Sequence, residues 1–148
     1  MITEKSAGFI LISENDNTSD PSDPSVLLLH YLSGHWDFPK GNIEIDETEM
    51  QAATRELKEE TGIEIFTLIP GFRHVLNYKY TKKSTLISKQ VTLFLASTDV
   101  NEVEISHEHI DHQWMEINAA VNQLTYSNAK IALTSAINFL KDLTQNSK

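Results

Sequence analysis

The sequence contains no cysteine among its 148 residues. Disulfide bonds, thiolate zinc sites, a cysteine nucleophile and thiol redox chemistry are therefore excluded, and any bound metal must be held by oxygen atoms or imidazole nitrogens. Long apolar runs are also missing, because stretches such as Val26–Leu29 are far shorter than the roughly 20 residues that a membrane-spanning helix needs. The segment Met1–Ser6 mixes Glu4 with Lys5 and lacks the pattern of a secretory signal, so we expect a cytoplasmic protein without a membrane span.

Positive charge is scarce in this chain. Twelve Lys and Arg residues stand against twenty-one Asp and Glu residues, which gives a formal net charge of −9. A surface of this sign repels nucleic acid, so we expect no nucleic-acid partner, and a polyanionic substrate needs a local cluster of positive groups. With 40% hydrophobic residues, a chain of this length buries a core of its own. We expect one domain over residues 1–148 and take a monomer as the starting expectation.

Short apolar segments and two amphipathic segments define the expected secondary structure. The expected strands are Ser6–Ser13, Ser25–Leu32, Ile63–Tyr80, Ser88–Thr98 and Ile110–Ile117. The polar segment Glu14–Pro24 is interpreted as a loop inserted between the first two strands, and Asn77–Ser84 is expected to contain a turn. Helices are expected over Asp46–Thr61 and Asn128–Leu143. This order favours an α/β (α+β) fold, a mixed β-sheet flanked by helices, over a helical bundle or a pure sandwich.

The two helices carry different patterns. In Asp46–Thr61 the residues Met50, Ala53 and Leu57 form one apolar stripe, with charged residues on the opposite side. Thr48 followed by Gln51 predicts a capping box at its start, and Gly62 predicts a left-handed residue at its end. In the second helix one apolar face is expected to pack on the sheet, made by Ile131, Ala132, Ala136, Ile137, Leu140 and Leu143.

Three carboxylates share one wall of the first helix. At about 100° per residue, Glu56, Glu59 and Glu60 fall within roughly a third of its circumference, with no cation opposite them. Like charges at this spacing destabilise a helix, so a positive group is expected to neutralise them. Mg²⁺ or Mn²⁺ fits this need, because hard divalent ions prefer oxygen ligands and substrate phosphates. The competing interpretation is a solvated helix face, which is the commoner role of glutamate-rich helices.

A longer pattern surrounds this wall and decides between the two interpretations. It consists of Gly41, five residues to Glu47, seven residues to Arg55-Glu56-Leu57, then Glu59-Glu60 and Gly62-Ile63. The pattern covers residues 41–63 and resembles the signature of the Nudix hydrolases, with every specified position filled. The resemblance implies a mixed β-sheet sandwiched between helices, and hydrolysis of a nucleoside diphosphate linked to another group.

The resemblance also implies roles for the residues of this box. Glu56, Glu59 and Glu60 would bind a divalent metal, with Glu59 the most critical of the three. The backbone carbonyl of Lys40 would add an oxygen ligand. Arg55 and Glu47 would form an orienting pair, and a bidentate hydrogen bond suits this role because Arg55 lies at the edge of the carboxylate wall. Gly41 and Gly62 are expected to meet backbone requirements, for a close approach and for the helix end respectively.

Residues outside the box suggest the substrate. The stretch from Tyr31 to Gly41 resembles the branch of the family that hydrolyses diadenosine tetraphosphate asymmetrically. The substrate-binding residues that this implies are Tyr31, His35, Lys40, Tyr78, Tyr80, Lys89 and Tyr126. Aromatic faces stack on adenine, so Tyr126 with Tyr78 or Tyr80 is expected to clamp a base, and the choice between the two stays open. Ordinary packing is the alternative for each single tyrosine, while lysine and histidine side chains offer positive charge to a polyphosphate.

A histidine-rich segment follows further along the chain. His107, His109 and His112 have spacings that permit a zinc site, but no cysteine assists them and no helical HExxH arrangement is present. The resemblance instead singles out Glu108 as a further metal ligand or as a proton acceptor, with Glu104 as its nearest competitor. Glu59 and Glu108 are therefore the two expected catalytic residues.

The expected function is hydrolysis of diadenosine tetraphosphate to ATP and AMP with Mg²⁺ or Mn²⁺. Water attacks the polyphosphate chain, and no covalent enzyme intermediate is needed. The alternatives are a hydrolase acting on another substrate, such as a nucleoside triphosphate, an RNA 5′ end or an inositol polyphosphate, and a catalytically silent nucleotide-sensing module. The silent module is disfavoured because such relatives lose part of the metal set, whereas this chain keeps all of it.

Overall fold

The computed structural model describes residues 2–14, 24–100 and 102–146. Its elements are β1 (Ile2–Ser13), β2 (Ser25–Tyr31), β3 (Trp36–Asp37), β4 (Lys40–Asn42), α1 (Glu49–Thr61), β5 (Thr67–Lys82), β6 (Thr85–Thr98), β7 (His109–Glu116), α2 (Ile117–Gln123) and α3 (Ser127–Asn146). The loop expected over Glu14–Pro24 lies almost entirely outside the described residues. Among the described residues, no helix is both long and apolar enough to cross a membrane.

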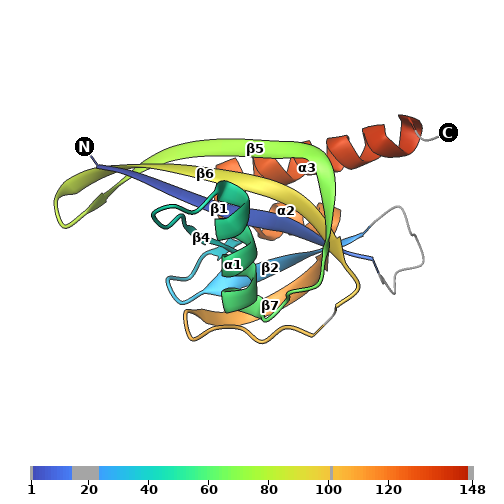
Figure 1. Ribbon diagram of the computed structural model, residues 1–148, viewed down its shortest axis with the longest axis horizontal. Coiled ribbons are helices and arrows are strands. Elements are labelled where there is room, and N and C mark those ends of the chain that lie inside the picture. Colours follow the sequence, from blue (N-terminus) through green and yellow to red (C-terminus); the bar gives the residue numbers. More distant parts are fainter. Residues whose placement is uncertain (1, 15–23, 101, 147–148) are drawn as a thin grey trace.

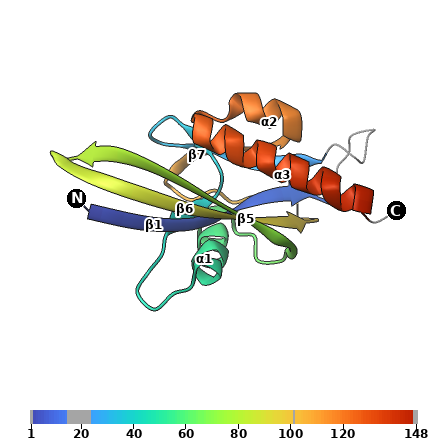
Figure 2. The ribbon, with the colours of Figure 1, turned by 90° about the horizontal axis from the view of Figure 1, so that it is seen from above.

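All the strands join one mixed sheet. The main order is β3-β2-β1-β6-β5, with β4 paired to β1 and β7 paired to β2. The central strands β1 and β6 run parallel, while the other pairs are antiparallel. Figures 1 and 2 show α1 on one face of the sheet and α2 and α3 on the other. The expected fold, a mixed sheet sandwiched between helices, is confirmed.

Each face of the sheet packs against its own helices, so the central strands are buried on both sides. Along β1, Phe9 and Leu11 belong to the core under α1, while Ile10 and Ile12 belong to the core under α2 and α3. This alternation follows from the two-residue period of a strand. Near-continuous apolar runs, rather than a polar and apolar alternation, therefore identify β1 and β2 in the sequence.

The helix α1 has the cap and the C-terminal end that its sequence predicts, but it starts at Glu49, directly after the Thr48 cap, instead of at Asp46. Ala53 and Leu57 are buried, and Met50 packs against the same core. The Thr48 side chain accepts a hydrogen bond from the Gln51 backbone, and the Gln51 side chain accepts one from the Thr48 backbone, which completes the capping box. Gly62 ends the helix with φ of 78°, a left-handed conformation that an L side chain adopts only with strain.

The long hairpin of β5 and β6 differs from the expectation. The expected turn region Asn77–Ser84 is strand down to Lys82, and the turn itself is only Lys83 and Ser84. These two residues have φ of 50° and 64°, the positive values of a two-residue turn whose twist matches the paired strands. Neither residue is one of the usual Asn or Gly signals, so the turn chemistry does not mark its place. The first strand of the hairpin, β5, also starts later than expected, at Thr67 instead of Ile63.

Short elements and part of one helix face were also missed. The sequence analysis left out β3, β4 and α2, each too short to show a clear period. On α3, four of the six residues expected to face the sheet do so, because Ala132 and Ala136 are buried and Ile137 and Leu140 pack against the same core. The contact face is nevertheless rotated in part, since Ile131 and Leu143 are exposed whereas Ala129 and Leu133 are buried. The spacing of apolar residues alone leaves this rotation open because α3 carries apolar side chains on more than one face.

The capping box gives a direct test of how α1 is held. Replacing Thr48 with Ala removes the acceptor for the Gln51 N–H, and we expect the free energy of unfolding to fall by about 1 kcal/mol. Thr134→Ala is the matched control, because the Thr134 hydroxyl only donates back to the Lys130 carbonyl in the middle of α3. Urea unfolding of the three proteins measures the difference. Equal stability of Thr48→Ala and the unaltered chain would contradict the cap.

Candidate functional site

Two cavities meet at Lys40. The first, called here the carboxylate cavity, has a volume of about 550 Å³ and lies beside α1. Its lining residues are Ser6, Tyr31, Lys40, Gly41, Asn42, Glu56, Glu59, Glu60, Lys89, Ser106, His107 and Glu108. The second, called here the tyrosine cavity, has a volume of about 680 Å³ and lies between the β5–β6 hairpin and the start of α3. Both volumes suit a small-molecule ligand.

Arg55 neutralises part of the carboxylate wall. Its guanidinium donates to both oxygens of Glu47, at 2.7 and 3.0 Å, so the orienting pair is present as expected. The same guanidinium donates to Glu56 at 2.8 Å and to Glu59 at 3.2 Å. The expectation that no cation opposes these carboxylates was therefore wrong. Arg55 immediately precedes Glu56, and its long side chain curls across the wall.

Of the three carboxylates of the helix wall, Glu60 is the one that forms no hydrogen bond or ion pair with Arg55 among the described contacts. It is buried, and its Oε2 accepts a hydrogen bond of 2.8 Å from the Lys40 N–H. Burial, and then the negative charge of Glu56, raise the pKa of Glu60 to about 9. Burial also raises the pKa of Glu56. A cation bound beside these groups would reverse this effect, since positive charge favours the ionised carboxylate.

The donor set of the carboxylate cavity fits a hard divalent cation. Within residues 2–14, 24–100 and 102–146, no three His, Asp or Glu side chains already converge as a metal cage. Glu56 and Glu59 instead share Arg55, which acts as their counterion. Carboxylate oxygens dominate the cavity wall, and its buried Glu60 is destabilised in the charged form. Oxygen-rich sites of this kind suit Mg²⁺ or Mn²⁺.

Glu108 faces the same cavity from the loop before β7. Its negative charge contributes to the raised pKa of both Glu56 and Glu60, which places its carboxylate close to theirs. Glu104, the alternative to Glu108 in the sequence analysis, does not line the cavity. Its backbone N–H donates a hydrogen bond to the Thr61 carbonyl near the end of α1. The structure thus brings together all four carboxylates that the sequence analysis proposed for the metal.

The three histidines of this segment do not form a metal site. His107 lines the carboxylate cavity, whereas the His109 ring contacts Ser106 and Glu60, and His112 lines neither cavity. The zinc alternative therefore finds no support in the described residues.

Gly41 provides the close approach that its position in the box implies. A Cβ atom at this residue would overlap the carboxylate of Glu56. Only a hydrogen atom fits at this position. The absence of a side chain at Gly41 therefore lets the Glu56 carboxylate pack directly against the backbone of β4.

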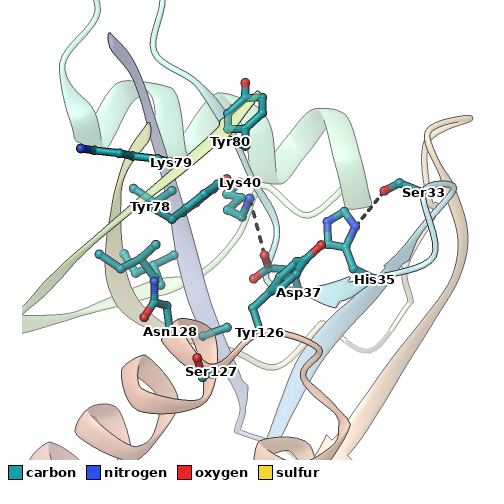
Figure 3. A pocket seen from close by; sticks show the side chains of 14 residues that line it. Ser33, His35, Asp37, Lys40, Tyr78, Lys79, Tyr80, Tyr126, Ser127 and Asn128 are labelled. Carbon is teal, nitrogen blue, oxygen red and sulfur yellow. Dashed lines mark hydrogen bonds and ion pairs between the residues drawn. The ribbon is translucent and has the colours of Figure 1, made fainter. Parts of the chain in front are cut away.

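The tyrosine cavity contains two aromatic walls, as Figure 3 shows. Tyr78 lies on β5 and Tyr126 just before α3, and both are partly exposed, at 38% and 54%. Between them, the Lys40 side chain lies 3.6 Å from the buried carboxylate of Asp37. Burial opposes the charged form of Lys40, but the negative charge of Asp37 outweighs it and raises the pKa of Lys40. Lys40 is therefore a cation at neutral pH.

Three other residues expected to bind substrate have different surroundings. Tyr80 lines the tyrosine cavity, but its hydroxyl binds Glu4. Tyr31 is packed between the rings of His35 and His109, and its hydroxyl donates to the Phe38 carbonyl at 2.7 Å. Tyr31 therefore supports the site through packing. His35 stacks on Tyr31 with ring centroids 4.6 Å apart and faces the tyrosine cavity.

Lys89 reaches the carboxylate cavity from β6. It donates to the Asn42 side chain at 2.8 Å, and Ser6 donates to the same oxygen at 2.9 Å. Asn42, Ser6 and Asp37 were missed in the sequence analysis. Asn42 lies within the box at an unspecified position. Ser6 lies 25 residues or more from every other residue that lines this cavity, and no pattern in the chain marks either of them.

Comparison with known proteins places this geometry in a family. The NUDIX domain model matches residues 5–135. The asymmetrical bis(5′-nucleosyl)-tetraphosphatase of Rattus norvegicus is 37% identical over 136 residues, which cover 88% of this chain and 87% of the rat protein. The corresponding protein of Mus musculus is 36% identical and is aligned over 84% of its length. A crystal structure of a C. elegans Ap4A hydrolase binary complex superposes with a TM-score of 0.80 at 30% identity, covering 94% of this chain and 98% of that one.

Replacing Gly41 with Ala tests the close approach to Glu56. The added methyl group must push Glu56 out of its place, so we expect Mn²⁺ binding, measured by electron paramagnetic resonance, to weaken at least about ten-fold. Thr54→Ala, at an exposed position of α1, is the control and keeps wild-type binding. Thermal unfolding checks that both variants remain folded. A folded Gly41→Ala protein with unchanged Mn²⁺ affinity would show that Glu56 has room to spare.

Proposed function

This chain belongs to the NUDIX family, and from that premise we propose that it hydrolyses diadenosine tetraphosphate to ATP and AMP. The observation that supports the proposal is the meeting of two cavities at Lys40, one with aromatic walls and one lined by carboxylates. A dinucleotide needs both surroundings, because its bases are flat and apolar whereas its phosphates carry negative charge. The rat and mouse relatives are named for asymmetric cleavage of bis(5′-nucleosyl) tetraphosphates.

The tyrosine cavity would hold one adenine. Tyr78 and Tyr126 present ring faces from different elements on its two sides (Figure 3). Stacking of a base on an aromatic ring stabilises a complex by about 1 to 3 kcal/mol and tolerates any base edge. Tyr78 is better placed than Tyr80 for this role, since the Tyr80 hydroxyl is tied to Glu4. The choice that the sequence left open thus falls on Tyr78.

The phosphates would run from the tyrosine cavity past Lys40 into the carboxylate cavity. Lys40 lines both cavities and Lys89 lines the second, so two ammonium groups flank this path. Each ammonium group would donate hydrogen bonds to phosphate oxygens and would also attract them through its compact positive charge. Together they provide the local positive charge that an acidic chain needs for a polyanionic substrate.

The carboxylate cavity would hold Mg²⁺ or Mn²⁺ through Glu56, Glu59 and Glu60. When bound there, a divalent cation supplies positive charge to the phosphate oxygens and makes water a stronger acid. Arg55 keeps Glu56 and Glu59 oriented through its hydrogen bonds to both and to Glu47. Lys40 contributes its backbone N–H to Glu60 and its side chain to the substrate.

A carboxylate of this cavity would accept the proton of the attacking water. Glu108 is better placed than Glu59 for this step, because Arg55 already binds Glu59 whereas no described residue forms a hydrogen bond or ion pair with the Glu108 carboxylate. A carboxylate that accepts no hydrogen bond from a neighbouring side chain keeps its lone pairs available for that proton. Lys40 and Lys89 would then stabilise the charge that develops on the departing phosphate.

Product analysis tests the reaction. Purified protein with diadenosine tetraphosphate and Mg²⁺ should release ATP and AMP in equal amounts, and a chelator should abolish turnover. Ion-exchange chromatography separates the nucleotides at several time points. Formation of ADP as the sole product, or failure to turn over this dinucleotide, would reject asymmetric cleavage.

Replacement of Tyr126 tests the base clamp. We expect Tyr126→Ala to lower kcat/KM for diadenosine tetraphosphate by about 5- to 150-fold, the equivalent of one lost stacking interaction. The loss for diuridine tetraphosphate should be smaller, because uracil offers less surface for stacking. Tyr126→Phe keeps the ring and should remain within about two-fold of the unaltered chain. An equal loss for both dinucleotides, or a similar loss in Tyr126→Phe, would argue against stacking.

A further inference from the structure

The His109 side chain lies fully buried beside the carboxylate cavity, and the proposed reaction gives it no role. Its exposed fraction is 0%, and its Nε2 is a buried atom with no hydrogen-bond partner among the described residues. Buried polar atoms of native proteins are almost always paired, so this nitrogen calls for an explanation. Glu60 Oε1 lies 3.6 Å from it.

The other ring nitrogen is already engaged. Ser106 Oγ lies 2.8 Å from His109 Nδ1. The same hydroxyl oxygen accepts the Glu108 backbone N–H at 3.3 Å, which leaves its own hydrogen free to point at Nδ1. With Nδ1 as the acceptor of this hydrogen bond, the hydrogen of the imidazole lies on Nε2, the atom that faces Glu60.

The geometry on the Glu60 side leaves one oxygen for this hydrogen. Oε2 is occupied by the Lys40 N–H at 2.8 Å. An approach of about 0.5 Å brings Oε1 within hydrogen-bond distance of His109 Nε2. The Tyr31 ring packs edge-on against His109 with centroids 4.4 Å apart, which restricts rotation of the imidazole.

We propose that His109 is a positioning residue that donates its Nε2 hydrogen to Glu60 and fixes the carboxylate in the orientation that binds a divalent cation. The inference rests on the proposed function, because it assigns Glu60 to the cation. Ser106 sets the tautomer of His109, and the backbone of Glu108 orients Ser106. The short segment of residues 106–109, at the end of the loop and the start of β7, therefore supplies a cavity carboxylate and also holds the buried carboxylate on α1. Hydrogen-bonding partners of metal ligands typically change metal affinity by 10- to 100-fold.

Metal binding by variants of His109 tests the proposal. Mn²⁺ alone serves as the probe, with its dissociation constant measured by electron paramagnetic resonance. We expect His109→Phe to weaken binding about ten-fold, and His109→Gln to remain within about three-fold because its amide N–H replaces Nε2–H. His112→Phe, on the same strand but lining neither cavity, is the control and should bind as the unaltered chain does.

Two results would overturn the inference alone: unchanged affinity in folded His109→Phe, or equal weakening in His109→Gln and His109→Phe. Absence of Mn²⁺ binding by the unaltered chain would overturn the proposed metal site as well. A second measurement does not depend on the folding of any His109 variant. Nitrogen-15 NMR of the unaltered protein with saturating Mg²⁺ should show the Nε2–H form of His109, and Ser106→Ala should increase the share of the Nδ1–H form. A predominant Nδ1–H form in the unaltered protein would refute the proposal.

Discussion

The crowding of carboxylates against a buried surface is the constraint on which the site depends. Glu56 and Glu60 lie on one wall of α1, and burial raises the pKa of both side chains. Arg55 offsets the charge of Glu56 and of Glu59, but its described contacts do not extend to Glu60. Removing a charge from water without a partner is costly, and the cation of the proposed function would offset this cost.

The fold brings distant segments to this wall and holds them there. The capping box and Gly62 fix the two ends of α1, and the core under it fixes its rotation. Lys40 arrives from the start of β4, Lys89 from β6 and Glu108 from the loop before β7, while the sheet keeps these elements in register (Figure 1). The cavity is therefore assembled from segments that only the complete sheet places side by side.

Local patterns in the sequence were sufficient for the parts of the molecule that depend on neighbouring residues. The cap of α1, its C-terminal end and its carboxylate wall follow from local patterns, and the pairing of Arg55 with Glu47 follows from the box. The sequence analysis failed where partners are remote or the element is short. The hydrogen bond between Tyr31 and the Phe38 carbonyl depends on how β2 and β3 turn, and the burial of Asp37 beside Lys40 depends on the whole cavity. Neither contact has a period or a motif.

The sequence analysis predicted that the three carboxylates of α1 need a positive group to neutralise them. It overlooked that Arg55 supplies part of that positive charge. Side-chain reach explains the error, because helical spacing describes where Cβ atoms lie and not where a long guanidinium ends. The turn of the β5–β6 hairpin lies at the end of the predicted region Asn77–Ser84, so both strands extend further toward the turn than expected. Lys83 and Ser84 adopt positive φ values because the twist of the paired strands requires a turn of this kind, although neither residue is a common turn signal.

Charge balance connects the metal to the substrate. Four carboxylates and two ammonium groups line the carboxylate cavity, and both lysines are already engaged, Lys40 with Asp37 and Lys89 with Asn42. Without added cations, the cavity would oppose a polyphosphate. A divalent ion that makes the electrostatic potential in the cavity positive would raise the affinity for the phosphates. By reciprocity, the bound phosphates would raise the affinity for the ion. Under the proposed function, an acidic protein can thus select a polyanion, because binding would depend on cations held by the carboxylates and not on the sign of its surface.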